Sequence, residues 1–154
     1  IQLPSSQPTA GLTVAAEGQN VTVDTGNLVI TAAGKGIVHA GSGTVTQGTS
    51  GTPNYATGVT LNTTSGIITL DSAETLAAGA FEEFVVTNST VQADSVILLQ
   101  VQSLAEGSET TDSSLIAYTN TIAGGSFNIL LQNGSDATLA AGARKIHFLV
   151  INNS

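Results

Sequence analysis

The chain has no cysteine, methionine or tryptophan, and only three of its 154 residues are lysine or arginine. Without cysteine there is no disulfide framework, so stability must come from packing or from association of subunits. The net charge of −8 disfavours binding to nucleic-acid phosphates or to an anionic membrane. No apolar run approaches the ~20 residues of a membrane-spanning helix, and we expect no membrane insertion.

Charged residues make up only 9% of the chain, well below the ~25% that is typical of soluble domains. Surface helices need Glu, Lys and Arg on their solvent-facing side, and no long stretch has helical periodicity. Hydrophobic residues still make up 41%, which is too many for a disordered chain. Short alternating runs, each closed by a turn that contains Gly or Asn, therefore predict an all-β fold.

Three regions are predicted along the chain. Residues 1–11 contain two of the three prolines and are typical of an extended N-terminal arm. Residues 12–50 hold short runs such as LTVAA, NLVITAAG and GTVTQG, which fit a stalk-like or prism-like region built from several chains. Residues 51–154 hold longer strands and predict an antiparallel β-sandwich of the jelly-roll type. We expect the whole chain to form a homotrimer.

Two further expectations concern the sandwich. Residues 59–61 and 67–70 alternate on either side of a TTSG turn, and we expect them to form a hairpin. The run VILLQV at residues 96–101 is apolar on both faces. It predicts a central strand that is covered on both sides, with Leu98 and Leu99 buried.

The hexapeptide TLAAGA occurs twice, at residues 75–80 and 138–143, and each copy precedes a long predicted strand. Its Ala-Ala-Gly part can form a tight turn with the glycine at positive φ. Two copies therefore predict matching corners in the two halves of a sandwich.

A charged pair follows each copy of the hexapeptide, acidic after the first and basic after the second. Both pairs can simply make the strand starts soluble. Alternatively, they form cross-strand or inter-subunit ion pairs that fix the register of the strands. Such pairs would act on specificity, because surface ion pairs contribute only ~0–1 kcal/mol to stability. The four residues are Glu82, Glu83, Arg144 and Lys145.

No catalytic signature is found, and we expect no enzymatic activity and no cofactor. His39 and His147 lie in different predicted strands without a patterned acid, and both GxSxG and GxGxxG are absent. We expect His147 to face solvent or a subunit interface. The acids of residues 106–112 are the best candidate cation site, but a solvated loop is favoured because no D-x-D-x-D core is present. Four Asn-x-Ser/Thr sequences, which we attribute to composition, begin at Asn20, Asn62, Asn88 and Asn133.

Two segments of the chain carry a resemblance to a known family. They read GVTLNTTSGIITLDSAETLAAGAFEEFVVTNSTVQADSVILLQVQ and, further along, IAGGSFNILLQNGSDATLAAGARKIHFLVIN. Together they resemble a β-rich domain of tailed-phage virion proteins, many of them marine. Those proteins show a TGVTLN hairpin, LAAG with FxVTNS, an apolar VILLxV strand, an AGSF strand and a final FxVI strand in the same order. GNLVITAAGKGI is similar to a short element of phage tail-fibre stalks. The resemblance covers residues 26–152 and implies no site residues, since its members are mostly uncharacterised.

The resemblance implies a non-enzymatic structural protein at the surface of a virion, as a trimeric fibre or spike component. Its expected partners are further copies of itself, other capsid or tail proteins, and a host-surface glycan. The mean hydropathy of +0.27 agrees, because apolar surface is then hidden in an oligomer. An alternative is a capsid decoration (cement) protein that clamps capsomers through residues 1–11. A carbohydrate-binding module or enzyme is a third class, disfavoured because only two tyrosines and four phenylalanines are available for sugar stacking.

Overall fold

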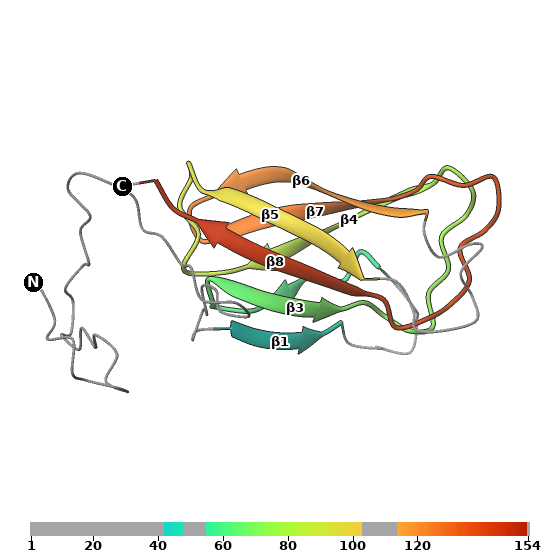
Figure 1. Cartoon of the computed structure of the whole chain (residues 1–154), viewed down its shortest axis with the longest axis horizontal. Coiled ribbons are helices and arrows are strands. Elements are labelled where there is room, and N and C mark those ends of the chain that lie inside the picture. Colours follow the sequence, from blue (N-terminus) through green and yellow to red (C-terminus); the bar gives the residue numbers. More distant parts are fainter. Residues whose placement is uncertain (1–41, 48–54, 103–113, 154) are drawn as a thin grey trace, which may run out of the picture. The chain divides into compact units, whose positions relative to one another are not determined.

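The computed structural model describes residues 42–47, 55–102 and 114–153, all within the unit Val38–Ser154. This described part is all-β without a helix, which confirms the predicted fold class (Figure 1). The predicted arm, most of the predicted stalk, His39 and the 106–112 loop lie outside the described residues. The strands are β1 (Ser42–Thr46), β2 (Val59–Thr60), β3 (Ser65–Thr69), β4 (Phe81–Thr87), β5 (Val96–Gln102), β6 (Leu115–Ala123), β7 (Ser126–Asn133) and β8 (Lys145–Ile151).

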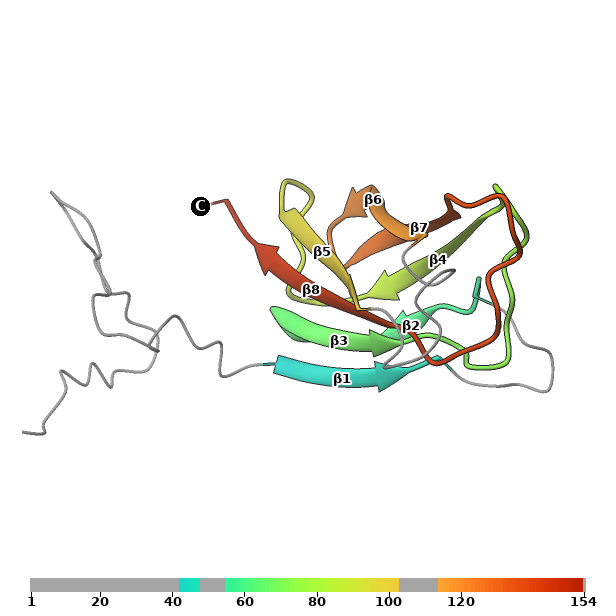
Figure 2. The same ribbon diagram turned by 45° about the vertical axis from the view of Figure 1, so that its right-hand side comes forward.

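These strands form two four-stranded sheets, sheet A in the order β1-β3-β8-β5 and sheet B in the order β2-β4-β7-β6 (Figure 2). The inner pairs are antiparallel, whereas β1–β3 and β2–β4 are parallel. The expected wholly antiparallel arrangement is therefore wrong at one edge of each sheet. From β1 to β4 the chain changes sheet after every strand, so it returns to the same sheet in the same direction. For the same reason, the predicted hairpin is wrong, because β2 and β3 lie in different sheets.

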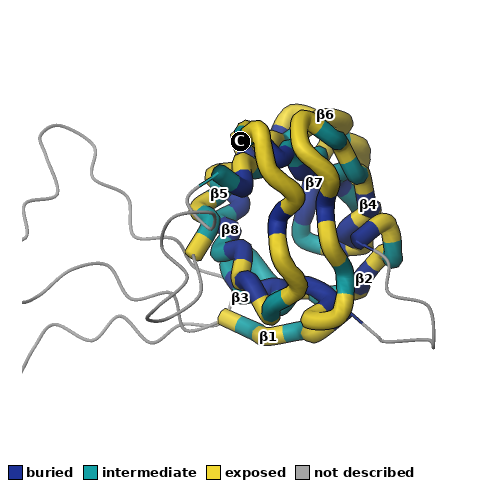
Figure 3. The backbone as a smooth tube through the Cα atoms, turned by 90° about the vertical axis from the view of Figure 1, so that its right-hand side faces the viewer, coloured by how far each residue is buried: buried dark blue, intermediate teal, exposed yellow. Residues whose placement is uncertain are grey.

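The core lies between the two sheets and follows from the alternation of side chains along each strand. On β7 the buried positions are Phe127, Ile129 and Leu131, and alternate positions on β8 are buried in the same way. The rings of Phe127 and Phe148 join the sheets, with centroids 5.6 Å apart and planes tilted by 58°. Figure 3 views the two layers from one end and colours each described residue by its burial.

The predicted boundary after residue 50 lies too late in the chain. Residues 42–46, assigned above to the stalk-like region, instead form an edge of sheet A, and Gln47 directly after them is buried. Tyr55, next to that boundary, is fully buried in the core. The Gln47 side-chain amide donates to the Tyr55 carbonyl at 2.9 Å. A run of five residues cannot form a stable sheet by itself, but it can extend an existing edge.

The strand β5 lies at the other edge of sheet A and is not covered on both faces in the described chain. Ile97 points inward and is buried, whereas Val96 and Leu98 are 45% and 52% exposed. The prediction of a buried Leu98 is therefore wrong, and Leu99 is only partly buried. An apolar sequence shows that a face avoids water, but it does not identify what covers that face.

Replacing Gly66 with alanine is expected to destabilise sheet A by about 1–3 kcal/mol through overpacking. A Cβ atom at this position of β3 would lie 2.8 Å from the Phe148 ring and 2.9 Å from the Gly43 carbonyl oxygen. Chemical denaturation measures the change in unfolding free energy. Gly124 is the matched control, since a Cβ there has no neighbour within 4 Å. Equal midpoints for the two variants would contradict this packing.

Candidate functional site

The two copies of the hexapeptide meet each other beyond one end of the strands. Leu76 and Leu139 form an antiparallel bridge, with N–H to O distances of 3.3 and 2.8 Å. Both leucines are buried, and the copies lead into β4 of sheet B and β8 of sheet A. The structure thus supports matching corners in the two sheets. Gly79 has the expected positive φ of 68°, whereas Gly142 does not, so the two turns differ in detail.

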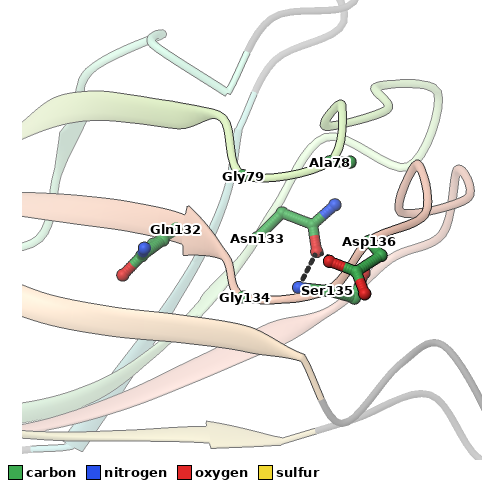
Figure 4. Close-up of a pocket in the computed structure, with 7 residues that line it drawn as sticks. All are labelled: Ala78, Gly79, Gln132, Asn133, Gly134, Ser135 and Asp136. Atoms are coloured by element: carbon green, nitrogen blue, oxygen red, sulfur yellow. Dashed lines mark hydrogen bonds between the residues drawn. The ribbon is translucent and has the colours of Figure 1, made fainter.

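Asn133, at the end of β7, holds this junction together. Its side-chain nitrogen donates to the carbonyl oxygens of Leu76, Ala77 and Ala137 at 2.9, 3.1 and 2.8 Å. Its side-chain oxygen accepts from the backbone N–H and the hydroxyl of Ser135 at 3.0 and 2.7 Å (Figure 4). The fully buried amide therefore satisfies backbone groups from both connections.

Asn88 has the equivalent role at the end of β4. Its side-chain oxygen accepts from the N–H and hydroxyl of Thr90 at 3.0 and 2.8 Å, and its nitrogen donates to the Thr63 carbonyl at 2.8 Å. Such Asn-centred turns mimic a backbone turn. The attribution of the Asn-x-Ser/Thr sequences to composition is therefore wrong at Asn88 and Asn133. Their position at the end of a strand is the signal that would have revealed them.

The two adjacent bases after the second hexapeptide have opposite environments. Arg144 is buried, and its guanidinium donates to the Ala140 carbonyl at 2.8 Å and to the Tyr55 hydroxyl at 3.3 Å. The Tyr55 hydroxyl donates in turn to the Glu74 carbonyl. Burial raises the pKa of Tyr55 above its ordinary 10.0, so this hydroxyl stays protonated at neutral pH. Lys145, by contrast, is exposed on β8.

The acidic pair lies on β4 of sheet B, so it is not beside these bases. The Glu83 carboxylate accepts from the side-chain nitrogens of Asn120 and Asn128 at 2.8 and 2.9 Å. The Asn128 bond, and then the Asn120 bond, hold the pKa of Glu83 below its ordinary 4.5. Since β4 pairs only with β2 and β7, the described chain does not bring Glu82 or Glu83 into a cross-strand pair with Lys145. An inter-subunit pair stays a prediction.

A shallow polar hollow lies between the first hexapeptide and the segment at the end of β7 (Figure 4). Of the described residues that line it, only Asp136 is ionisable, and the polar atoms of Asn133 are already used within the chain. A single carboxylate supplies no paired acid and base. In the described ranges, no three His, Asp or Glu side chains gather to hold a metal ion. The lining residues are Ala78, Gly79, Gln132, Asn133, Gly134, Ser135 and Asp136.

The outer face of sheet A carries a contiguous aliphatic patch. Val96 pairs with Ile151, and Leu98 pairs with Leu149, so the four side chains lie on neighbouring strands. We call these four residues the aliphatic face. His147 lies beside it, faces away from the core as expected, and is hydrogen-bonded to Gln102 at 2.8 Å. Neither β5 nor the nearby β6 contains an acidic or basic residue.

The outer face of sheet B mixes aromatic, aliphatic and polar side chains, and Val85 and Ile116 on it are 44% and 39% exposed. Phe81 on β4 and Tyr118 on β6 are 54% and 45% exposed. The Glu83 carboxylate and its two asparagine partners occupy neighbouring positions on the same face. We call these five residues the aromatic face: Phe81, Glu83, Tyr118, Asn120 and Asn128.

Comparison with known proteins finds no matching family model, no matching curated protein and no matching solved structure. Among the residues that the structure describes, no helix is long and apolar enough to cross a bilayer. The functional interpretation therefore depends on the surfaces of the two sheets and on the sequence resemblance.

Proposed function

We propose that the chain is a non-enzymatic structural component of a virus particle, displayed at its surface as a homotrimeric fibre or spike element that contacts the host surface. The observation that carries the proposal is the aliphatic face. Val96, Leu98 and Ile151 are each about half exposed on adjacent strands of one sheet. Contiguous apolar surface of this kind marks contact with another protein. The resemblance to virion domains supplies the setting.

A second copy of the chain is the partner that this face fits best. A chain with net charge −8 repels its own copies, unless they approach through surface that carries no charge. The uncharged strand β5 supplies such surface. The edge of β5 is not paired within its own sheet, but it lies beside β6, where the Thr119 hydroxyl donates to the Ile97 carbonyl. In a closed three-fold ring each copy covers the exposed face of its neighbour, so no apolar edge is left open.

A jelly-roll-like domain is part of the same proposal. The chain pairs β3 with β8 and β4 with β7, and then adds β5 and β6 outside these pairs. This nested order of antiparallel pairs is the connectivity of jelly rolls, which occur in viral capsid proteins. The parallel strands β1 and β2 extend that arrangement at its other edges.

A capsid decoration protein is the second candidate, and the proline-containing residues 1–11 favour it, because an extended arm suits a clamp on a capsid. Immunogold labelling of intact particles with an antibody against this chain separates the two. Label at a tail or projecting fibre supports the first proposal, and label spread evenly over the head supports the second. Unlabelled particles would contradict both.

Leu98→Asp is expected to dissociate the trimer while the fold is retained. A carboxylate on the exposed side of β5 is solvated in the monomer, but it becomes an unpaired buried charge in the interface. We expect the dissociation constant to rise by about 100-fold or more. Sedimentation measures the mass, and circular dichroism verifies the fold.

Val85→Asp is the matched control, because Val85 is 44% exposed on β4 of the other sheet. Its association is expected to match that of the unmodified chain. Leu98→Asp that remains fully associated would show that the aliphatic face is not the interface. Leu98→Asp that unfolds would show that this face is needed within a single chain.

A further inference from the structure

The exposed aromatic residues of this chain lie on one face. Its two tyrosines and four phenylalanines are all in the described ranges. Four of the six are buried in the core, and the other two, Phe81 and Tyr118, point outward from sheet B. The apolar surface of an exposed ring stays in contact with water, so the ring contributes little to the stability of the fold. Their common face therefore suggests a ligand that stacks on rings.

Polar groups are held in fixed positions between and beside these rings. The Glu83 carboxylate lies on β4 opposite Leu130, which lies opposite Tyr118 in turn. One carboxylate oxygen accepts both asparagine bonds, and the Tyr118 hydroxyl donates to the Gln132 side-chain oxygen at 3.2 Å. These groups stand on paired strands, so a ligand would meet them already ordered.

Several hydrogen-bonding atoms of this network still face solvent. Within the described residues, the second oxygen of Glu83 and the side-chain oxygens of Asn120 and Asn128 accept no hydrogen bond. They form a group of acceptors beside two rings. A pyranose has the complementary pattern, because its C–H groups lie on the faces of the ring and its hydroxyl donors lie around the rim.

We propose that the aromatic face binds a neutral oligosaccharide, with Phe81 and Tyr118 stacking on sugar rings and with Glu83, Asn120 and Asn128 accepting from hydroxyls. Charge decides between neutral and acidic sugars. Glu83 is anionic, and of the two described bases Lys145 lies on sheet A and Arg144 is buried. A carboxylated or sulfated sugar would therefore meet repulsion, and no base of the described residues lies on this face to compensate it. The inference names the ligand of the proposed host-surface contact and rests on that proposal.

Saturation-transfer difference NMR tests this on the full chain. The probes are maltotetraose, cellotetraose, chitotetraose and mannotetraose, each at millimolar concentration, with sialyllactose as the acidic comparison. We expect at least one neutral tetrasaccharide to bind, and sialyllactose to give no signal. Tyr118→Ala and Phe81→Ala are each expected to weaken that binding by about tenfold or more. Thr87→Ala, an exposed change at the far end of β4, should leave it unchanged.

Three results would overturn the inference: no signal from any neutral probe, a signal only from sialyllactose, or binding that persists unchanged in Tyr118→Ala. A trimer that dissociates in Tyr118→Ala would also overturn it, by showing that a second copy covers this face. The assembly proposal fails separately. If the protein is a monomer that binds a neutral sugar, the assembly proposal is wrong and the oligosaccharide inference stands. If it is a trimer that binds none of the neutral probes, the oligosaccharide inference is wrong and the assembly proposal stands.

Discussion

Arg144→Ala is expected to lower the free energy of unfolding by about 3–5 kcal/mol. The side chain is 1% exposed, so its removal leaves a cavity next to the core. It also removes the donors to the Ala140 carbonyl and to the Tyr55 hydroxyl, which are then left with one bond fewer inside the protein. Because Tyr55 also holds Gln47 through its carbonyl, the loss should extend to the edge strand β1.

Lys145→Ala is the matched control, because it also removes one positive charge, from the next residue, which is exposed. We expect it to shift the unfolding free energy by no more than about 0.5 kcal/mol. Arg144→Met separates the two causes, since it keeps most of the side-chain volume without the donors. Urea denaturation measures all three variants. Equal stabilities for Arg144→Ala and Lys145→Ala would show that the buried guanidinium does not hold the hexapeptide junction.

Asn133→Asp is expected to destabilise the protein by about 3 kcal/mol or more at neutral pH. The change preserves the shape of the side chain, but it replaces the amide donor with a buried carboxylate. The carbonyls of Leu76, Ala77 and Ala137 then lose their shared donor and face a negative charge. Thermal unfolding followed by circular dichroism measures the loss.

The pH dependence of this variant follows from linkage. Burial and the facing carbonyls raise the pKa of the new carboxyl in the folded state, so the neutral form is favoured there. The variant is therefore least destabilised below the unfolded pKa of about 3.9, and the deficit grows as the pH rises. Asn62→Asp is the control, because Asn62 is exposed and uses only its side-chain oxygen, which accepts from the Ser89 N–H. A deficit that is equal in both variants would contradict the role given to Asn133.

The sequence allowed a long strand to be predicted after each hexapeptide, and β4 and β8 lie at these positions. Phe127, Ile129 and Leu131 are spaced two residues apart with Asn128 and Gln132 on the other face, so their burial follows from the period of two. The VILLQV run led to a wrong prediction that both faces of β5 are buried. Ile97 and Leu98 are equally apolar in the sequence, but of these two only Ile97 faces the other sheet. The order of the strands in the sheets could not be predicted either, because nothing in the local sequence indicates that β1 pairs with β3.

The candidate site residues were only partly accessible from the sequence. The repeat of TLAAGA correctly indicated matching corners, but the direct bridge between Leu76 and Leu139 depends on tertiary structure. Arg144 and Lys145 looked alike as a basic pair, and burial separates them. The gathering of Phe81 and Tyr118 on one face could not be inferred either, because it requires the register of β4 and β6 against β7.

The mass of the protein in solution tests the central proposal most directly, because in that proposal further copies of the chain cover the aliphatic face. Sedimentation equilibrium over nanomolar to micromolar concentrations is the measurement. We expect a mass of three times the 15.4 kDa of one chain at micromolar concentration, with dissociation on dilution by mass action. A mass of 15.4 kDa at every concentration, with a circular-dichroism spectrum that shows intact β-structure, would contradict the proposal.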